Sequence, residues 1–471
     1  MTQLHEDRYF DSDPVVRRHA RALYGETRAL PIVSPHGHID AAILASNDSF
    51  ADPASLIVTP DHYILRMLYS RGVTLESLGV ASVDGTPLDV EQDPRKVWQT
   101  FADNWRLFRA TPTRAWIEYE LREVFGIKRD FESESAQHVY DAIAERLRSP
   151  EFRPRALFKR FNIEVLATTD GVGETLNHHD ALRTSDLPGR VIPTFRPDAL
   201  FRIAAPQWLD DLERFGRVTG APIGSHPEFV GALVRRRADF KTMGATATDH
   251  AVLVPRTERL KESEAGVLFD KALHGSASEE DQSRYEAHLL MEMARMSVDD
   301  GLVMQIHPGA LRNHNQWIYR RFGPDRGGDI PVATEFTRNL RPLLNAYGND
   351  PRFRLIVFTL DESTYSRELA PLAGHYPSLL LGAPWWFHDS IEGMTRFRRD
   401  TTETAGIENT AGFTDDTRAF CSIPARHDLA RRVDANYLGG LVARHVIDMS
   451  EAREMAKALA YDLVRSAYRL T

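Results

Sequence analysis

Eight short apolar runs, separated by segments with helical patterns, constrain the fold of this chain more than any other feature. Each run is four to six residues long, which suits a buried strand of a parallel sheet. The runs span residues 30–33, 163–167, 191–194, 245–248, 302–306, 353–358, 378–382 and 410–414. Strands that alternate with helices form parallel βα units, and eight such units close into a barrel. We therefore expect an α/β protein built as a (β/α)8 TIM-like barrel.

The connection between the first two predicted strands is too long for a single crossover helix. It holds helical patterns at residues 61–71, 95–108, 114–125 and 136–148. We expect residues 41–160 to form a helical insertion that caps the mouth of the barrel. No linker-like stretch divides the chain, so residues 1–471 are expected to form a single barrel domain. The chain should end in an amphipathic helix over residues 450–470, with Ser450 as its N-cap.

Charge and cysteine content argue against several classes of protein. The 471 residues include 58 Lys and Arg against 67 Asp and Glu, a net charge of −9, with no long block of one sign. This argues against a nucleic-acid partner or an anionic membrane surface. The single cysteine, Cys421, cannot form an internal disulfide and fits a reducing cytoplasm. We see no signal peptide and no run of about 18 apolar residues, so we expect a cytoplasmic protein with no membrane partner.

Side chains able to bind metals, anions or protons follow the predicted strands in order along the chain. They are His36 and His38, Asp170, Arg196, Asp249 and His250, His307 and Arg312, Asp361, Trp385 and Trp386, and Asp415, Asp416 and Arg418. A (β/α)8 barrel carries its active site at the C-terminal ends of its strands. We therefore expect these side chains to meet at one end of the barrel.

His36 and His38 lie two residues apart at the end of the first predicted strand, so their side chains point to the same face. Two imidazoles presented together can hold one divalent metal ion, and nitrogen ligands suit zinc. Asp416, after the last predicted strand, could complete a His-His-Asp site with an open position for substrate. Each feature alone is also compatible with chance or with an ordinary turn. His307 could either bind the metal or hydrogen-bond to one of its ligands.

Three arginines, Arg196, Arg312 and Arg418, follow other predicted strands of this acidic chain. The planar guanidinium matches a carboxylate, so their convergence predicts an anionic ligand, although a single arginine is more often part of a surface ion pair. Tyr63 could carry a proton. Trp386 could wall a sugar pocket, although aromatic residues more often pack in cores.

Several enzyme classes can be weighed against these residues. Glycine-rich nucleotide-binding motifs and the Gly-x-Ser-x-Gly elbow of serine hydrolases are absent. A mononuclear metal-dependent hydrolase on the same barrel remains an alternative, because His-x-His with a late Asp also serves amide hydrolysis. A bridged two-metal hydrolase usually carries a lysine on its fourth strand, and residues 245–248 contain none. A third interpretation is a catalytically silent barrel that binds a sugar acid. It is disfavoured because the chain retains candidate metal ligands together with a candidate acid and a candidate base.

Taken in order along the chain, nine segments resemble the uronate isomerase (glucuronate isomerase) family of the amidohydrolase superfamily. They are residues 31–38, Asp61-His62-Tyr63, 168–170, 193–198, 248–250, 307–313, 323–325, 385–387 and 416–420. The resemblance implies an aldose–ketose isomerase that interconverts D-glucuronate and D-fructuronate, or D-galacturonate and D-tagaturonate, through a cis-enediol. Its partner would be a small anionic sugar, a hexuronate, and a barrel of this size is compatible with a homo-oligomer.

Carried over residue by residue, the resemblance implies that His36, His38 and Asp416 hold the metal. Asp416 would also take part in proton abstraction at C2, and Tyr63 would serve the proton step at C1. The residues lining the substrate would be Arg196, Asp249, His307, Arg312, Trp386 and Arg418. The chain departs from the family pattern at Ser34, Gly171, His314 and His388. These positions surround the implied site, so the sequence does not choose between the two uronates.

Overall fold

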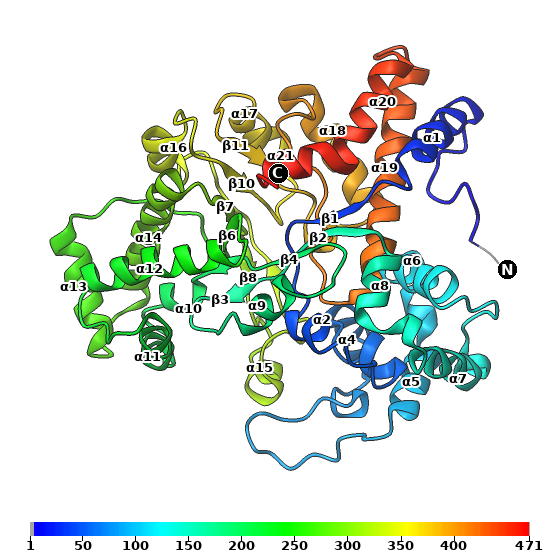
Figure 1. Cartoon of the computed structure of the whole chain (residues 1–471), viewed down its shortest axis with the longest axis horizontal. Helices are drawn as coiled ribbons and strands as arrows, with labels where there is room; N and C mark the ends of the chain where they lie inside the picture. Colours follow the sequence, from blue (N-terminus) through cyan, green and yellow to red (C-terminus); the bar gives the residue numbers. More distant parts are fainter. Residues whose placement is uncertain (1–3, 471) are drawn as a thin grey trace.

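The computed structural model describes residues 4–470 and has an α/β fold with parallel strands between helices (Figure 1). One sheet has three strands, in the order β1 (Ile32–Ser34), β2 (Ile163–Ala167) and β4 (Arg190–Ile192). The second sheet has six strands, in the order β11 (Leu379–Leu381), β10 (Leu355–Val357), β7 (Val303–Ile306), β6 (Ala247–His250), β5 (Phe195–Arg196) and β3 (Asp170–Gly171). Every strand pairing in these two sheets is parallel. The strands therefore adjoin in the order in which they occur along the chain.

The two sheets meet through two chain segments that run from one sheet into the other. β2 is followed by β3 after two residues, and β4 by β5 after two residues. Between them, Thr168 N donates to Ile192 O at 3.0 Å and Thr194 N donates to Thr168 O at 3.1 Å. The hydrogen-bond ladder thus continues from the first sheet into the second.

Seven of the eight predicted strands are present, each within two residues of the expected bounds. The strand predicted at residues 410–414 is wrong, because this segment makes only one isolated bridge, between Thr410 and Leu381. Gly412 lies inside it with φ +75°, and a left-handed residue breaks the extended backbone that a ladder needs. The segment nevertheless reaches the end of β1, where the Thr414 hydroxyl donates to His36 O at 2.9 Å and His38 N donates to Thr417 O at 2.9 Å.

One buried apolar cluster joins all these segments. It takes side chains from the seven strands and from residues 410–414: Val33, Val165, Ile192, Ala247, Val303, Ile356, Leu380, Ala411 and Phe413. Side chains that point to the same face of a strand supply it, such as Val165 and Ala167 of β2, as expected for the inner face of a sheet. The strands therefore share one apolar interior.

Between β1 and β2 the chain is helical (blue to cyan in Figure 1). Its α-helices are α2 (Ala41–Ser46), α3 (Pro53–Ile57), α4 (His62–Tyr69), α5 (Pro94–Asp103), α6 (Pro112–Tyr119), α7 (Ala136–Leu147) and α8 (Pro154–Arg160). Aspartate or threonine caps begin several of them; for example, Asp61 accepts from Tyr63 N and fixes the start of α4. The helix predicted at residues 114–125 ends in a π-helical turn at Glu120–Val124.

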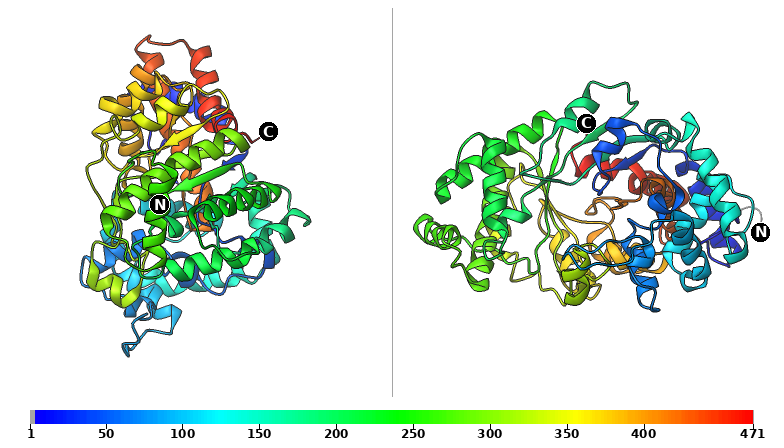
Figure 2. Two further views of the ribbon diagram at one scale, coloured as in Figure 1. Left: turned by 90° about the vertical axis from the view of Figure 1, so that its left-hand side faces the viewer. Right: turned by 90° about the horizontal axis from the view of Figure 1, so that it is seen from below.

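Other helices lie on the outside of the strands. Four of them form one flank of the molecule (green in Figures 1 and 2): α11 (Trp208–Thr219), α12 (His226–Thr242), α13 (Glu262–Leu273) and α14 (Glu279–Asp300). Helix α19 (Ile423–Ala443) packs against α1 (Pro14–Thr27) near the opposite flank.

The C-terminal helix differs from the prediction. It is divided into α20 (Met449–Lys457), a π-helical turn (Ala458–Asp462) and α21 (Leu463–Ala467). Ser450 is not its N-cap; Asp448 is, because its carboxylate accepts from Glu451 N at 2.9 Å while Glu451 accepts from Asp448 N. Within residues 4–470, no helix is long and apolar enough to cross a membrane.

Candidate active site

A buried cluster of histidine and carboxylate groups lies at the C-terminal ends of the strands. His36 and His38 follow β1, and their Nε2 atoms lie 3.4 Å and 3.1 Å from Asp416 Oδ1. His307, which follows β7, stacks on His36 with ring centroids 4.6 Å apart. Ligand atoms of His36, His307 and Asp416 all lie within 4.8 Å of one another. The predicted ligands therefore come together, and His307 joins them.

The donor set of this cluster fits a divalent metal ion. Two buried nitrogen atoms, His36 Nδ1 and His307 Nε2, have no hydrogen-bond partner within residues 4–470, and the buried Asp416 Oδ1 faces only the two histidines named above. Buried polar atoms are normally paired, so unpaired imidazole nitrogens beside a carboxylate call for a partner that accepts their lone pairs. Imidazole and carboxylate ligands together suit zinc or a neighbouring transition metal.

Asp249, at the end of β6, fixes the orientation of His307. His307 Nδ1 hydrogen-bonds to Asp249 Oδ1 at 2.6 Å, which leaves Nε2 directed elsewhere. Carboxylates commonly orient metal-bound histidines in this way. Arg196 lies 2.7 Å from Asp198 Oδ2 and 3.5 Å from Asp249 Oδ2. Arg196, Asp249 and His307 thus form one hydrogen-bonded and ionic group behind the cluster.

The electrostatics of the cluster favour an ionised carboxylate. Burial would raise the pKa of Asp416, but the adjacent His36 and His38 hold that pKa well below its ordinary value. Burial lowers the pKa of His38 and of His307. At neutral pH these two imidazoles are therefore neutral, which is the form that binds metals.

A cavity opens beside the cluster and is lined by most of the predicted site residues. Its walls are His38, His62, Tyr63, Arg312, Asp325, Trp385, Trp386, Asp416 and Arg418. Arg312 lies over the Trp386 ring at 5.3 Å and pairs with Asp329 at 2.8 Å, while Arg418 lies 3.3 Å from Asp325. Two of the three predicted arginines therefore line this cavity. Arg196 is not among its lining residues.

Tyr63 reaches the cavity from helix α4, far from the strands in sequence. Its hydroxyl donates to Asp389 Oδ2 at 2.9 Å, and Arg426 Nη1 donates to the same oxygen at 2.8 Å. Burial, and then the charge of Asp389, raises the pKa of Tyr63 well above its ordinary value, so the phenol keeps its proton at neutral pH. Sequence reasoning missed Asp389 and Arg426. It also missed His62, which stacks on Tyr63 at 4.8 Å although it stands in a motif we had identified.

Backbone conformation at the site is unusual for side-chain-bearing residues. Asp416 has φ +41° and Trp386 has φ +37°, both in the left-handed region that favours glycine. Such conformations cost of order 1–3 kcal/mol each and cluster at active sites, where the surrounding structure enforces them. Here they aim two predicted site residues into one cavity.

Parallel strands that end in a buried histidine–aspartate cluster beside a polar cavity are the features of an α/β enzyme. The sequence model of the glucuronate isomerase family matches residues 1–468. The chain belongs to the glucuronate isomerase family and is an isomerase.

Individual relatives agree over the whole chain. A uronate isomerase from Rhizorhabdus wittichii is 53% identical over 468 residues, which cover 99% of both chains. The crystal structure of glucuronate isomerase from Caulobacter crescentus is 49% identical, with a TM-score of 0.97 over 100% of this chain and 97% of that chain. The crystal structure of uronate isomerase from Thermotoga maritima is 29% identical, with a TM-score of 0.92 over 99% of this chain and 100% of that chain. These relatives do not favour the alternative of a hydrolase.

Proposed function

We propose that this protein interconverts D-glucuronate and D-fructuronate, or D-galacturonate and D-tagaturonate, or both pairs, through a cis-enediol. The observation that carries the proposal is that Asp416 and Tyr63 line the same cavity, with Arg312 and Arg418 in its wall. Aldose–ketose exchange moves a proton between adjacent carbons, so it needs a base at one carbon and a second proton carrier at the other. The family membership supports the same reaction.

Each proton carrier has a defined place in this proposal. The Asp416 carboxylate removes the proton from C2, and the Tyr63 phenol, held by Asp389, serves the proton step at C1. Arg312 and Arg418 bind the carboxylate of the uronate, because a guanidinium pairs with a carboxylate through two parallel hydrogen bonds. Trp386 forms an apolar wall for the sugar ring.

We further propose that one divalent metal ion, zinc, is held by His36, His38 and Asp416, with His307 as a further candidate ligand. The orphaned atoms of the cluster and the mixed nitrogen and oxygen donors support this. When bound, such an ion supplies a positive charge that stabilises negative charge on the substrate oxygens. Arg196, Asp249 and His307 are proposed to line the substrate as well, and Asp249 also holds His307 in position.

The architecture that we propose is a closed (β/α)8 barrel in a single domain, with residues 41–160 as a cap over its mouth. The shared apolar interior and the hydrogen bonds from residues 414–417 to the end of β1 support closure. The presence of Tyr63 from helix α4 in the cavity supports the cap. We also propose that the small-molecule partner is a hexuronate and that the protein forms a homo-oligomer. A cytoplasmic location is proposed as well, and the single cysteine supports it.

To test the reaction, the metal-loaded protein is incubated with each uronate and the sugar products are followed by NMR. We expect ketose to form without a change in mass, and a reaction in heavy water shows whether the transferred proton exchanges with solvent. Asp416→Asn should abolish turnover. Tyr63→Phe should slow it about 10²–10⁴-fold, the usual contribution of a positioned proton carrier. Tyr69→Phe, an exposed tyrosine on the same helix α4, is the matched control and should remain fully active. Hydrolysis of N-acyl amino acids or lactones without uronate turnover would instead establish the hydrolase.

The metal is tested separately by elemental analysis of protein purified without chelator. About one equivalent of zinc per chain is expected, as for a mononuclear site. His38→Asn and Asp416→Asn should lower that content, because each removes a proposed ligand. His138→Asn, which changes an exposed histidine on α7, should keep it. Wild-type protein that contains no metal, or equal metal in all four proteins, contradicts the assignment.

A further inference from the structure

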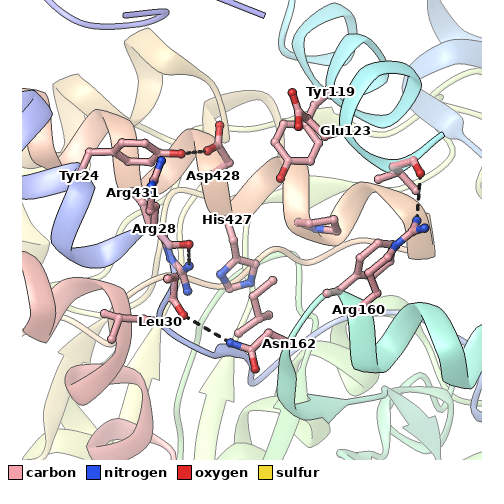
Figure 3. Close-up of a pocket in the computed structure, with 15 residues that line it drawn as sticks. Tyr24, Arg28, Leu30, Tyr119, Glu123, Arg160, Asn162, His427, Asp428 and Arg431 are labelled. Carbon is pink, nitrogen blue, oxygen red and sulfur yellow. Dashed lines mark hydrogen bonds between the residues drawn. The ribbon is translucent and has the colours of Figure 1, made fainter. Parts of the chain in front are cut away.

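A second cavity, separate from the candidate active site, lies between helices α1, α6, α8 and α19. Its volume is about 420 Å³. Figure 3 shows Tyr24 from α1, Tyr119 from α6, Arg160 from α8 and His427 from α19 around this space. We call it the arginine cavity, after Arg28, Arg160 and Arg431 in its lining. It shares no lining residue with the active-site cavity.

The arginine cavity carries positive charge without matching carboxylates. Considering residues 4–470, none of its three arginines has a carboxylate oxygen within 4 Å. Asp428 also lines the cavity, but Arg8 lies 2.6 Å and Arg432 3.0 Å from its Oδ2, and the Tyr24 hydroxyl donates to its other oxygen. The negative charge of Asp428 is thus engaged by arginines outside the lining. The remaining acid, Glu123, is exposed.

Arg431 is the buried arginine of the cavity lining. Only 7% of it is exposed, and its Nη1 and Nη2 donate to Arg28 O at 3.1 Å and to Pro31 O at 2.9 Å. Its buried Nε has no hydrogen-bond partner within the described residues. Burial lowers the pKa of Arg431, and the charge of Asp428 offsets only part of this effect. A buried guanidinium without a counter-ion is costly, and an anion in the cavity would offset that cost.

Arg160 is held in a fixed orientation at another wall of the cavity. Its Nη2 donates to Val124 O at 3.0 Å, and its guanidinium lies 4.6 Å from the centre of the Phe152 ring. A guanidinium that is already ordered loses little entropy when it binds a further group. The Tyr119 hydroxyl, also in the lining, has no hydrogen-bond partner within residues 4–470 and can donate to a ligand.

We propose that the arginine cavity binds a small organic anion, of monosaccharide size, through its carboxylate or phosphate group. Arginine recognises both groups through the same paired hydrogen bonds. The volume lies within the usual range for small-molecule sites and exceeds what a bare inorganic ion fills. This proposal stands whether or not the chain isomerises uronates, because none of its residues takes part in that reaction.

The test is calorimetric titration of the metal-loaded wild-type enzyme with three probes of one size: D-gluconate, D-glucose 6-phosphate and neutral D-glucose. At least one anion should bind and glucose should not; the tighter anion identifies carboxylate or phosphate as the recognised group. Arg160→Ala should weaken its binding about tenfold or more, as expected for loss of a charge-assisted contact. Arg235→Ala, an exposed arginine on α12, should leave it unchanged.

A second pair of variants fixes the location. Arg431→Met should also weaken anion binding, and Arg28→Ala provides an exposed alternative if the buried substitution prevents folding. Arg312→Met, in the active-site cavity, should leave the binding intact. The proposal is overturned if neither anion binds, if glucose binds equally well, or if Arg312→Met abolishes binding that Arg160→Ala leaves unchanged.

Discussion

At the scale of single residues, Asp389 joins three side chains that come from distant parts of the chain. It accepts from the Tyr63 hydroxyl and from Arg426, and Arg426 lies 3.6 Å from the centre of the Trp116 ring. All four side chains are buried. We infer that Asp389 is a positioning residue, because it holds the phenol of Tyr63 and neutralises Arg426 without lining the cavity itself.

We expect Asp389→Asn to lower kcat more than it changes KM, since the phenol loses a charged hydrogen-bond acceptor. The Asp389 charge raises the pKa of Tyr63. Its removal should therefore lower that pKa and move the alkaline limb of the pH–rate profile to lower pH. Asp400→Asn, an exposed aspartate on α18, is the control. An unchanged alkaline limb, with thermal unfolding showing an intact fold, would exclude this role.

At the scale of elements, the ends of β10 and β11 support His307, and through it the histidine–aspartate cluster, by close packing. Phe358, just after β10, stacks on His307 with ring centroids 3.9 Å apart. Gly382, just after β11, leaves the space that this ring occupies, because a Cβ there would lie 2.4 Å from Phe358 Cδ1. The absence of a side chain at position 382 thus positions His307 through Phe358.

Gly382→Ala should therefore displace Phe358 and disturb His307. We expect a destabilisation of roughly 1–3 kcal/mol, as for other overpacked cores, together with weakened metal retention. Gly266→Ala is the matched control, because Gly266 lies within helix α13 and nothing lies within 4 Å of an added Cβ. That substitution should be neutral or stabilising. Urea denaturation and metal analysis of both variants measure the difference, and equal behaviour would refute the packing argument.

At the scale of the whole molecule, one buried acid makes stability depend on pH. Glu120 lies at the end of α6 and is 4% exposed. Burial, with a further contribution from Asp61, raises its pKa from 4.5 to about 8. Below pH 4.5 this glutamate is protonated in both the folded and unfolded chains. Between pH 4.5 and 8 the unfolded chain ionises first, so folded-state stability is lost as pH rises.

Glu120→Gln should remove the loss of folded-state stability that wild type shows as pH rises from 4.5 to 8. Relative to wild type, the variant should be more stable at pH 8.5 by up to roughly 5 kcal/mol, and the difference should shrink towards pH 5. Glu145→Gln, an exposed glutamate on α7, should show no such pH-dependent gain. Urea midpoints at both pH values decide the matter, and a gain that is independent of pH would assign the effect to packing.

The sequence predicted those parts of the fold that local pattern encodes. Apolar runs of strand length located seven strands, because burial on both faces of a parallel sheet leaves a continuous apolar signal. The eighth run contained the same apolar signal, but Gly412 is left-handed and packs so closely against Val464 that a Cβ there would lie 2.4 Å from Val464 Cγ2, a tertiary contact that no local pattern records.

The residues of the candidate site likewise fall into those that the sequence predicted and those that it did not. Residues after strands, such as His36, His38 and Asp416, could be predicted because a barrel brings strand ends together. Asp389 could not, because its partner Tyr63 lies 326 residues away and no periodicity connects them. The place of His307 within the cluster was left open by the sequence, since only the hydrogen bond to Asp249 shows which ring nitrogen is free.

The contact between the Thr414 hydroxyl and the His36 carbonyl has a consequence for how the protein is made. The two residues are 378 positions apart. At about 5–20 residues per second, a ribosome would need roughly 20–80 s to extend the chain from one to the other. Throughout that time the emerging polypeptide carries His36 and His38 without Asp416. The histidine–aspartate cluster therefore cannot form in a nascent chain that has not yet reached Asp416, however early its two histidines emerge from the ribosome.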